Sequence, residues 1–210
     1  MKLKYKIINK YVPPIITFWG LRFVDSEFRP MFKYIEQNSN NKYLTGVEIG
    51  VWRGTNAVSI LNHINIKKLF LVDPYIINKE YEPSWLPECT QSDISNDFKI
   101  ASNKLNSFKD KITFIISPSE EAVKDIPDNL DFVYIDGNHS YDFVKKDIEL
   151  FYPKVCIGGV FGGHDYSPKF LGVVRAVDDF VYKHSLFLNR EKIDWWVVKK
   201  EKGKSKSKTI

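Results

Sequence analysis

The stretch from Gly46 to Asp73 limits the possible folds of this 210-residue chain more than any other part. It has a short apolar strand, a turn with two glycines, an amphipathic helix and a second apolar strand that ends in an acid. The helix has apolar residues at helical spacing on one face, so that it can lie on a sheet: Ala57, Val58, Ile60, Leu61 and Ile64. This order predicts one strand–helix–strand half of a nucleotide-binding sheet.

The turn and the terminal acid of this stretch predict where a ligand binds. Gly50 and Gly54 bracket a sharp bend, and a Cβ there would obstruct a close approach of the backbone to a ligand. Asp73 ends the second strand, where an acid commonly accepts hydrogen bonds from a ribose. The glycines lack the G-x-G-x-x-G spacing, and Glu48 lies within the strand, which suits a cofactor with an amino group better than a pyrophosphate. We expect a sugar-bearing cofactor here; a plain strand–turn–helix junction is the alternative.

The remaining apolar runs predict further strands of the same sheet. The run 130–135 is nearly continuous, as in a central parallel strand. Helices are expected over 94–108, 141–152 and 173–183, and strands over 47–49, 69–72, 112–116, 130–135, 155–161, 186–189 and 195–199. We therefore predict an α/β fold: a Rossmann-like, doubly wound, mostly parallel seven-stranded sheet with an antiparallel C-terminal hairpin strand and helices on both faces.

The chain divides into three expected parts. Residues 1–43 form a leader or cap with a helix from about Asp25 to Gln37, residues 44–200 form the main domain, and residues 201–210 form a basic flexible tail. Residues 199–210 hold six lysines and one glutamate, which account for the whole net charge of +5. The body is therefore neutral, which disfavours a bulk polyanion-binding surface. The tail is either a solvated terminus or a contact for nucleic acid.

Three further features bear on location and substrate. The apolar segment 11–21 contains Pro13 and Pro14 and is too short to span a bilayer, so no membrane partner is expected. Cys89 and Cys156 match neither a metal finger nor a disulfide framework, which favours a reducing, cytoplasmic location. The irregular stretch 74–92 is expected to be a lid or substrate wall, or surface decoration. Its candidate stacking residues are Tyr75, Tyr81 and Trp85.

Polar side chains follow the two strands 130–135 and 155–161. Asp136 ends the first, and His164 and Asp165 follow the second. Two carboxylates that converge at one rim would repel each other unless a divalent cation compensates them. Mg²⁺ suits oxygen ligands, whereas His164 as a ligand favours Mn²⁺ or Fe²⁺. The alternative is that both acids cap loops and contact only the cofactor.

Two more side chains near this rim have candidate roles. His139 follows Asp136 by three residues, and its offset turns the ring over the pocket, where it would accept a proton from a metal-activated hydroxyl. Ordering the loop is its alternative role. Ser119, after the strand 112–116, is expected to be the N-cap of the next helix.

From about Tyr43 to Lys199 the sequence resembles the class I S-adenosylmethionine-dependent methyltransferases, and within them a small family similar to the macrocin-type sugar O-methyltransferases. The resemblance rests on VEIGVWRG, a DPY exit from the second strand, YIDGNHSYDFVKKDIELFYPKV, GGVFGGHDY and GVVRAVDDF. It implies a metal held by Asp136 and Asp165, with His164 beside them where the family often has a second acid, and His139 as the base. It implies cofactor contacts from Glu48, Gly50, Arg53, Gly54, Asp73, Ser119 and Asp136.

The leading hypothesis is a metal-assisted O-methyltransferase that uses S-adenosylmethionine and acts on a small hydroxylated acceptor, such as a sugar or glycan unit. One alternative is a non-catalytic module that binds a nucleoside, or nucleic acid through its lysine tail. An NAD-type oxidoreductase is disfavoured by the missing G-x-G-x-x-G and Tyr-Lys pair. A capped-RNA methyltransferase is disfavoured by the neutral body, which supplies no basic groove. Homo-oligomerisation remains open.

Overall fold

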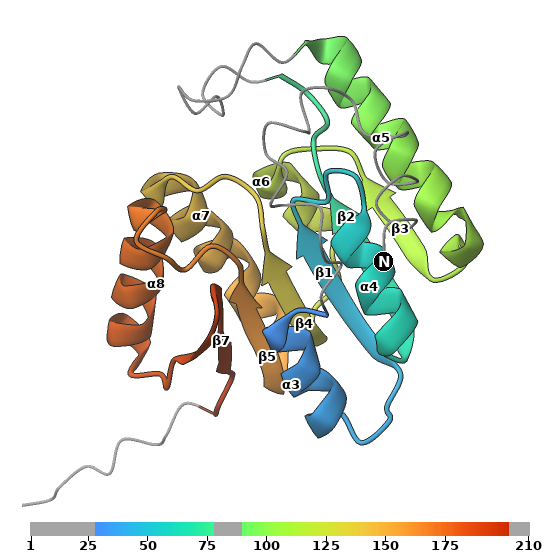
Figure 1. Cartoon of the computed structure of the whole chain (residues 1–210). Coiled ribbons are helices and arrows are strands. Elements are labelled where there is room, and N and C mark those ends of the chain that lie inside the picture. Colours follow the sequence, from blue (N-terminus) through green and yellow to red (C-terminus); the bar gives the residue numbers. More distant parts are fainter. Residues whose placement is uncertain (1–27, 78–89, 202–210) are drawn as a thin grey trace, which may run out of the picture.

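A computed structural model describes residues 28–77 and 90–201 of the chain, and it has a seven-stranded sheet at its centre (Figure 1). The strand order is β3-β2-β1-β4-β5-β7-β6. Neighbouring strands are parallel from β3 to β5, and β7 is antiparallel to both β5 and β6. The strands are β1 Leu44–Ile49, β2 Ile66–Val72, β3 Ile112–Ile115, β4 Leu130–Ile135, β5 Val155–Gly163, β6 Asn189–Glu191 and β7 Asp194–Val198. The predicted fold class is confirmed.

The described helices are α3 Pro30–Asn38, α4 Thr55–His63, α5 Gln91–Leu105, α6 Ser119–Ala122, α7 Tyr141–Phe151 and α8 Leu171–His184. Short 3₁₀ turns follow three of them, over Asn106–Phe108, Val123–Asp125 and Tyr152–Lys154. The helix predicted from residue 25 begins at Pro30, because proline fits the first turn of a helix, where its missing N–H is not needed. The strand predicted over 186–189 lies at Asn189–Glu191.

Several predictions fall on residues 1–27, 78–89 and 202–210, outside the described residues. They concern the proline-interrupted leader, Tyr81, Trp85, Cys89 and the lysine tail. None of the helices that the structure describes is long and apolar enough to cross a membrane.

Two apolar cores lie on opposite faces of the sheet, which explains why the central strands are mostly apolar. In β4, Val133 faces the core shared with α7 and α8, whereas Phe132 and Tyr134 face the core shared with α3, α4 and α5. Because successive side chains of a strand point to opposite faces, a strand covered on both sides is apolar at most of its positions. Helix α3 covers β5 and β7 on the second face (Figure 1).

The strand register brings the predicted site residues to one rim. Ile49 of β1 pairs with Ile135 of β4, and Ile135 pairs with Gly163 of β5. The residues that follow these strands therefore meet at the carboxyl edge, where open α/β sheets bind ligands. Since β7 is antiparallel, its first residue, Asp194, reaches the same rim beside Gly163, which pairs with Trp195.

Candidate active site

The turn after β1 bends as the sequence predicts, and its glycines are needed for packing. Gly50 has φ +85°, and a Cβ there would lie 2.2 Å from the carbonyl oxygen of Asp136. Gly54 has φ +70°, and its Cβ would lie 3.0 Å from Leu105 Cδ1 of α5. The turn after β1 therefore lies directly against the residue that follows β4, so that these two parts of the rim are in contact.

Asp73, at the end of β2, holds this turn through backbone hydrogen bonds. Its Oδ2 accepts from the N–H groups of Val51 and Trp52 at 2.9 and 2.8 Å, and its Oδ1 accepts from Tyr75 N at 3.0 Å. The acid is thus in the predicted position beside the glycine turn. Contact with a ribose stays a prediction.

A second acid, Asp97 of α5, holds the side chains of the same turn. Arg53 Nε donates to its Oδ1 at 2.6 Å, and Trp52 Nε1 donates to its Oδ2 at 2.8 Å. Arg53 was expected to contact the cofactor, and the structure pairs it with α5. Sequence reasoning missed Asp97, because no motif links a residue in the middle of α5 to a turn more than 40 positions earlier.

Glu48 is buried under the turn and only half satisfied. Its Oε1 accepts a hydrogen bond from Asn56 Nδ2 of α4 at 2.9 Å. Its Oε2 and Asn56 Oδ1 are both buried and have no hydrogen-bond partner among the described residues. Burial raises the pKa of Glu48 to about 8. When Glu48 loses its proton, its Oε2 and Asn56 Oδ1 are two acceptors without donors, which a ligand group with several N–H donors would satisfy. Asn56 was also missed by sequence reasoning.

Asp136, His139 and Asp165 come together as predicted. Each offers one ligand atom, and these atoms lie within 4.8 Å of one another. His139 Nε2 lies 2.7 Å from Asp165 Oδ2, and its ring stacks on Phe170 with centroids 4.3 Å apart. His139 Nε2 and Asp165 Oδ1 are buried and have no aligned hydrogen bond among the described residues. A shared cation would satisfy both atoms.

His164 lies between the acids of three strands. Its Nδ1 is 3.5 Å from Asp136 Oδ1 and 3.4 Å from Asp165 Oδ1, and its Nε2 is 3.9 Å from Asp194 Oδ1. Burial opposes its charge, but the nearby carboxylates of Asp136 and Asp165 raise the pKa of His164 to about 9. Burial likewise opposes ionisation of Asp165, but its contacts with His139 and His164 lower the pKa of Asp165 well below its usual range. A protonated imidazole has no lone pair with which to bind a metal. His164 would have to lose a proton before it could coordinate one, and its role as a metal ligand stays a prediction.

Arg29 and Asp194 complete the rim, and sequence reasoning missed both. Arg29 Nη2 lies 3.6 Å from Asp136 Oδ2, and its Nη1 lies 3.9 Å from Asp194 Oδ1. Asp194 is 1% exposed and accepts hydrogen bonds from Tyr134 Oη at 3.0 Å and Met31 N at 3.3 Å. Neither residue belongs to a motif. For Asp194, the one available signal in the sequence was that an acid stands at the start of a strand that runs antiparallel to the others.

Ser119 does not cap its helix, so this prediction was wrong. Pro118 occupies the N-cap position and Ser119 is the first residue of α6. The Ser119 hydroxyl donates instead to Asp147 Oδ1 of α7. Asp147 is 5% exposed, and burial raises its pKa to about 7. The predicted contact of Ser119 with the cofactor stays a prediction.

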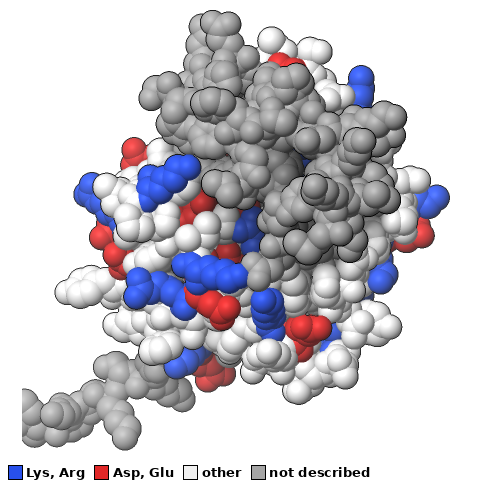
Figure 2. Space-filling model, in the orientation of Figure 1, with Lys and Arg blue, Asp and Glu red and all other residues white. Residues whose placement is uncertain are grey.

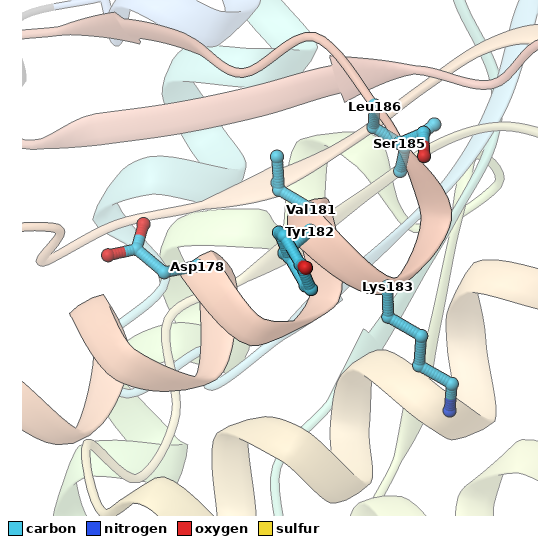
Figure 3. Close-up of a pocket in the computed structure, with 6 residues that line it drawn as sticks. All are labelled: Asp178, Val181, Tyr182, Lys183, Ser185 and Leu186. Carbon is cyan, nitrogen blue, oxygen red and sulfur yellow. The ribbon is translucent and has the colours of Figure 1, made fainter.

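Two surface features do not contribute to this rim. A pocket along the second half of α8 is lined by Asp178, Val181, Tyr182, Lys183, Ser185 and Leu186 (Figure 3). It contains none of the predicted site residues, since α8 begins at the rim and runs away from it. On the described part of the face in Figure 2, basic and acidic side chains are interspersed, as expected for a body without net charge.

Comparisons with known proteins bear on the fold and the family of this chain. The uncharacterized protein R132 of Acanthamoeba polyphaga mimivirus is 28% identical over 139 residues, which cover 64% of this chain and 59% of that protein. The chain thus spans less than two thirds of that relative. The O-methyltransferase NovP superposes with a TM-score of 0.60 at 18% identity, over 80% of this chain and 79% of NovP. CalS11, a TDP-rhamnose 3'-O-methyltransferase, has a TM-score of 0.60 at 12% identity, over 94% and 91% of the two chains.

These likenesses to solved structures establish the fold, which is that of class I methyltransferases. The family model described as "Methyltransferase domain" matches residues 47–166, which is more than half of the chain. The matched range includes the glycine turn, Asp73, Asp136, His139 and Asp165. The chain therefore belongs to the methyltransferase domain family.

Proposed function

We propose that this protein is an S-adenosylmethionine-dependent O-methyltransferase that acts on a small hydroxylated acceptor, such as a sugar or glycan unit. One observation carries the proposal: the buried oxygens of Glu48 and Asn56 that have no partner among the described residues lie beside the same rim as the acid–histidine group of Asp136, His139 and Asp165. A donor site and an acceptor site are thus adjacent on β1 and β4. Methyl transfer needs this arrangement, because aligning the two reactants lowers much of the barrier.

The residues around the glycine turn fit the proposed cofactor. Once Glu48 is ionised, which the positive charge of the α-ammonium group would favour, Glu48 Oε2 and Asn56 Oδ1 would accept hydrogen bonds from this group. Asp73 lies where it would meet the ribose, and Gly50 permits close approach of the backbone. When bound, S-adenosylmethionine supplies a methyl group on an electrophilic sulfonium, so the protein has mainly to orient the acceptor and remove its proton.

The acid–histidine group fits a divalent metal, with Mg²⁺ favoured by the carboxylates and Mn²⁺ compatible with the imidazole. Asp136 and Asp165 would supply oxygen ligands, and His139 Nε2, which faces Asp165 without an aligned hydrogen bond, would supply the third. Bound there, the metal would polarise the acceptor hydroxyl. The base role that the family resemblance implies for His139 is the alternative use of the same ring.

The sugar acceptor rests on two supports. The motifs resemble macrocin-type sugar O-methyltransferases, and CalS11, which shares the fold, is a TDP-rhamnose 3'-O-methyltransferase. Identity to CalS11 is 12%, so the acceptor needs its own test. Screening glycosides and nucleotide sugars with radiolabelled S-adenosylmethionine would provide it.

Calorimetric titration of S-adenosylmethionine, repeated with Mg²⁺ and with EDTA, tests the cofactor. We expect micromolar binding in all three conditions, and no binding of NAD as the control. Binding of NAD alone would contradict the proposal. If neither S-adenosylmethionine nor NAD bound, the result would favour a non-catalytic module.

Asp165→Ala tests the metal site. We expect loss of methyl transfer with unchanged S-adenosylmethionine affinity, because Asp165 lies on the acceptor side of the rim. Turnover that survives both this substitution and EDTA would rule out the metal. His139→Gln then separates the two roles of the histidine: a lost ligand weakens Mn²⁺ binding, whereas a lost base leaves Mn²⁺ binding intact and removes turnover.

A further inference from the structure

Arg29 brings a permanent positive charge into the acid cluster of the rim. Arginine stays protonated at all working pH values. Its guanidinium lies 3.6 Å from Asp136 and 3.9 Å from Asp194, and its side chain is only 28% exposed. Burial opposes the charge of Arg29, but Tyr134 and the carboxylates of Asp136, Asp194 and Asp165 together raise its pKa. This cation thus interacts with all three rim acids.

The backbone holds Arg29 in place. It is the N-cap residue of α3, and its carbonyl accepts hydrogen bonds from the N–H groups of Phe32 and Lys33, both at 3.0 Å. Met31 and Phe32 are completely buried in the core beneath. Met31 N donates to Asp194, so the start of α3 is tied to β7. The Arg29 side chain therefore starts from a rigid point beside the rim, rather than from a loose terminus.

Both carboxylate oxygens of Asp136 already face a nitrogen-bearing side chain, and one of these side chains is the permanently charged Arg29. Oδ1 faces His164 and Oδ2 faces Arg29. A divalent metal held by Asp136 would have to share this carboxylate with the guanidinium and would experience its repulsion at short range. In a partly buried site such repulsion is only weakly screened by salt.

We propose that Arg29 is an internal counter-ion of the rim acids that competes with the divalent metal and sets its affinity. This inference rests on the metal site of the proposed function. It predicts that removal of the Arg29 charge strengthens metal binding, although it deletes an ion pair from the site. A merely structural arginine would give the opposite result, because its loss would loosen the ligands.

The test is a titration of Mn²⁺ into EDTA-treated full-length protein, followed by the paramagnetic resonance signal of free Mn²⁺. Arg29→Gln removes the charge, Arg29→Lys keeps it, and Lys33→Gln removes one charge from the next turn of the same helix. We expect Arg29→Gln to bind Mn²⁺ roughly 10- to 100-fold more tightly than the wild type, as for a unit charge close to a cation. Arg29→Lys and Lys33→Gln should match the wild type.

The outcomes separate this inference from the proposed function. Equal or weaker Mn²⁺ binding by Arg29→Gln would overturn the counter-ion role and leave the metal site standing. Failure of every variant to bind Mn²⁺ would remove the metal site and this inference together. A parallel titration of S-adenosylmethionine shows whether each variant is folded and whether the cofactor proposal survives.

Discussion

At the scale of single residues, the buried carboxyl group of Glu48 combines a cost in stability with the proposed contact to the cofactor. Its partner Asn56 satisfies one oxygen and leaves the other without a donor. A folded protein keeps such an arrangement at a cost, because a buried polar atom without a partner is destabilising by about 1–3 kcal/mol. The cost is expected where a ligand completes the bonding.

The raised pKa of Glu48 predicts how stability depends on pH. The folded state keeps the proton up to about pH 8, whereas the ordinary value for the unfolded state is 4.5. Between these values the folded state binds more protons, so the free energy of unfolding falls as pH rises. In Glu48→Gln this loss between pH 5 and pH 9 should shrink by about 1–4 kcal/mol. Urea denaturation at both pH values measures it, with exposed Glu36→Gln as the control; equal losses in Glu48→Gln and wild type would contradict the assignment.

The positions of residues that directly follow strands could be predicted from the sequence. The positions of residues that depend on the packing of other elements could not. Asp136 and Asp165 could be placed because parallel strands end at a common edge. Arg29 could not, because its place depends on how α3 packs on β5 and β7. Ser119 was assigned to a local cap, whereas its partner, Asp147, lies on another helix.

At the scale of elements, α5 supports the glycine turn after β1 from outside the sheet. The helix begins with a capping box between Thr90 and Asp93. It then presents Asp97 to the side chains of Trp52 and Arg53. The turn needs this support, since Trp52 has φ +47°, a conformation unfavourable for a residue with a Cβ.

We therefore expect Asp97→Ala to weaken the binding of S-adenosylmethionine about 5- to 30-fold, the effect of losing a charge-assisted contact worth about 1–2 kcal/mol. The rate at saturating cofactor should change little, because Asp97 lies away from the acid–histidine group. Calorimetry and initial rates measure the two quantities. Exposed Asp110→Ala is the control, and unchanged affinity in Asp97→Ala would show that α5 does not position the turn.

The elements themselves were largely predictable, and their ends were less so. Each expected helix and strand within the described residues exists, because both faces of the sheet are covered and the apolar pattern is strong. The last hairpin was shifted, since Leu186 and Leu188 pack against the core without joining the sheet. An apolar run in the sequence indicates that its residues are buried, but buried residues need not belong to a strand.

At the scale of the whole molecule, β5, β7 and α3 form a tightly packed junction. A Cβ at Gly162 of β5 would lie 2.1 Å from the carbonyl oxygen of Trp195 and 2.8 Å from Met31 Sδ. The close approach lets α3 lie directly on the sheet behind the rim acids. Sequence predicted the antiparallel hairpin, but the contact between the start and the end of the described chain was not visible in any local pattern.

Gly162→Ala should therefore lower the free energy of unfolding by about 1–3 kcal/mol, as overpacking of a filled core does. Gly137→Ala is the matched control, because its Cβ would meet only Ile49, at 3.8 Å. Guanidinium denaturation of both variants measures the difference. Equal stabilities would show that the junction can relax around an extra methyl group.

The place of β7 also has a consequence for how the protein is made. Ribosomes release a chain from its N-terminal end, so α3 leaves the exit tunnel about 160 residues before the strand on which it packs. Until Asp194 and Trp196 emerge, the Met31 N–H lacks the acceptor that it has in the folded protein, and the edge of β5 lacks the strand that pairs with it. The parallel half of the sheet can form during translation, but the rim that holds Arg29 against the acids is assembled only after β7 has been synthesised.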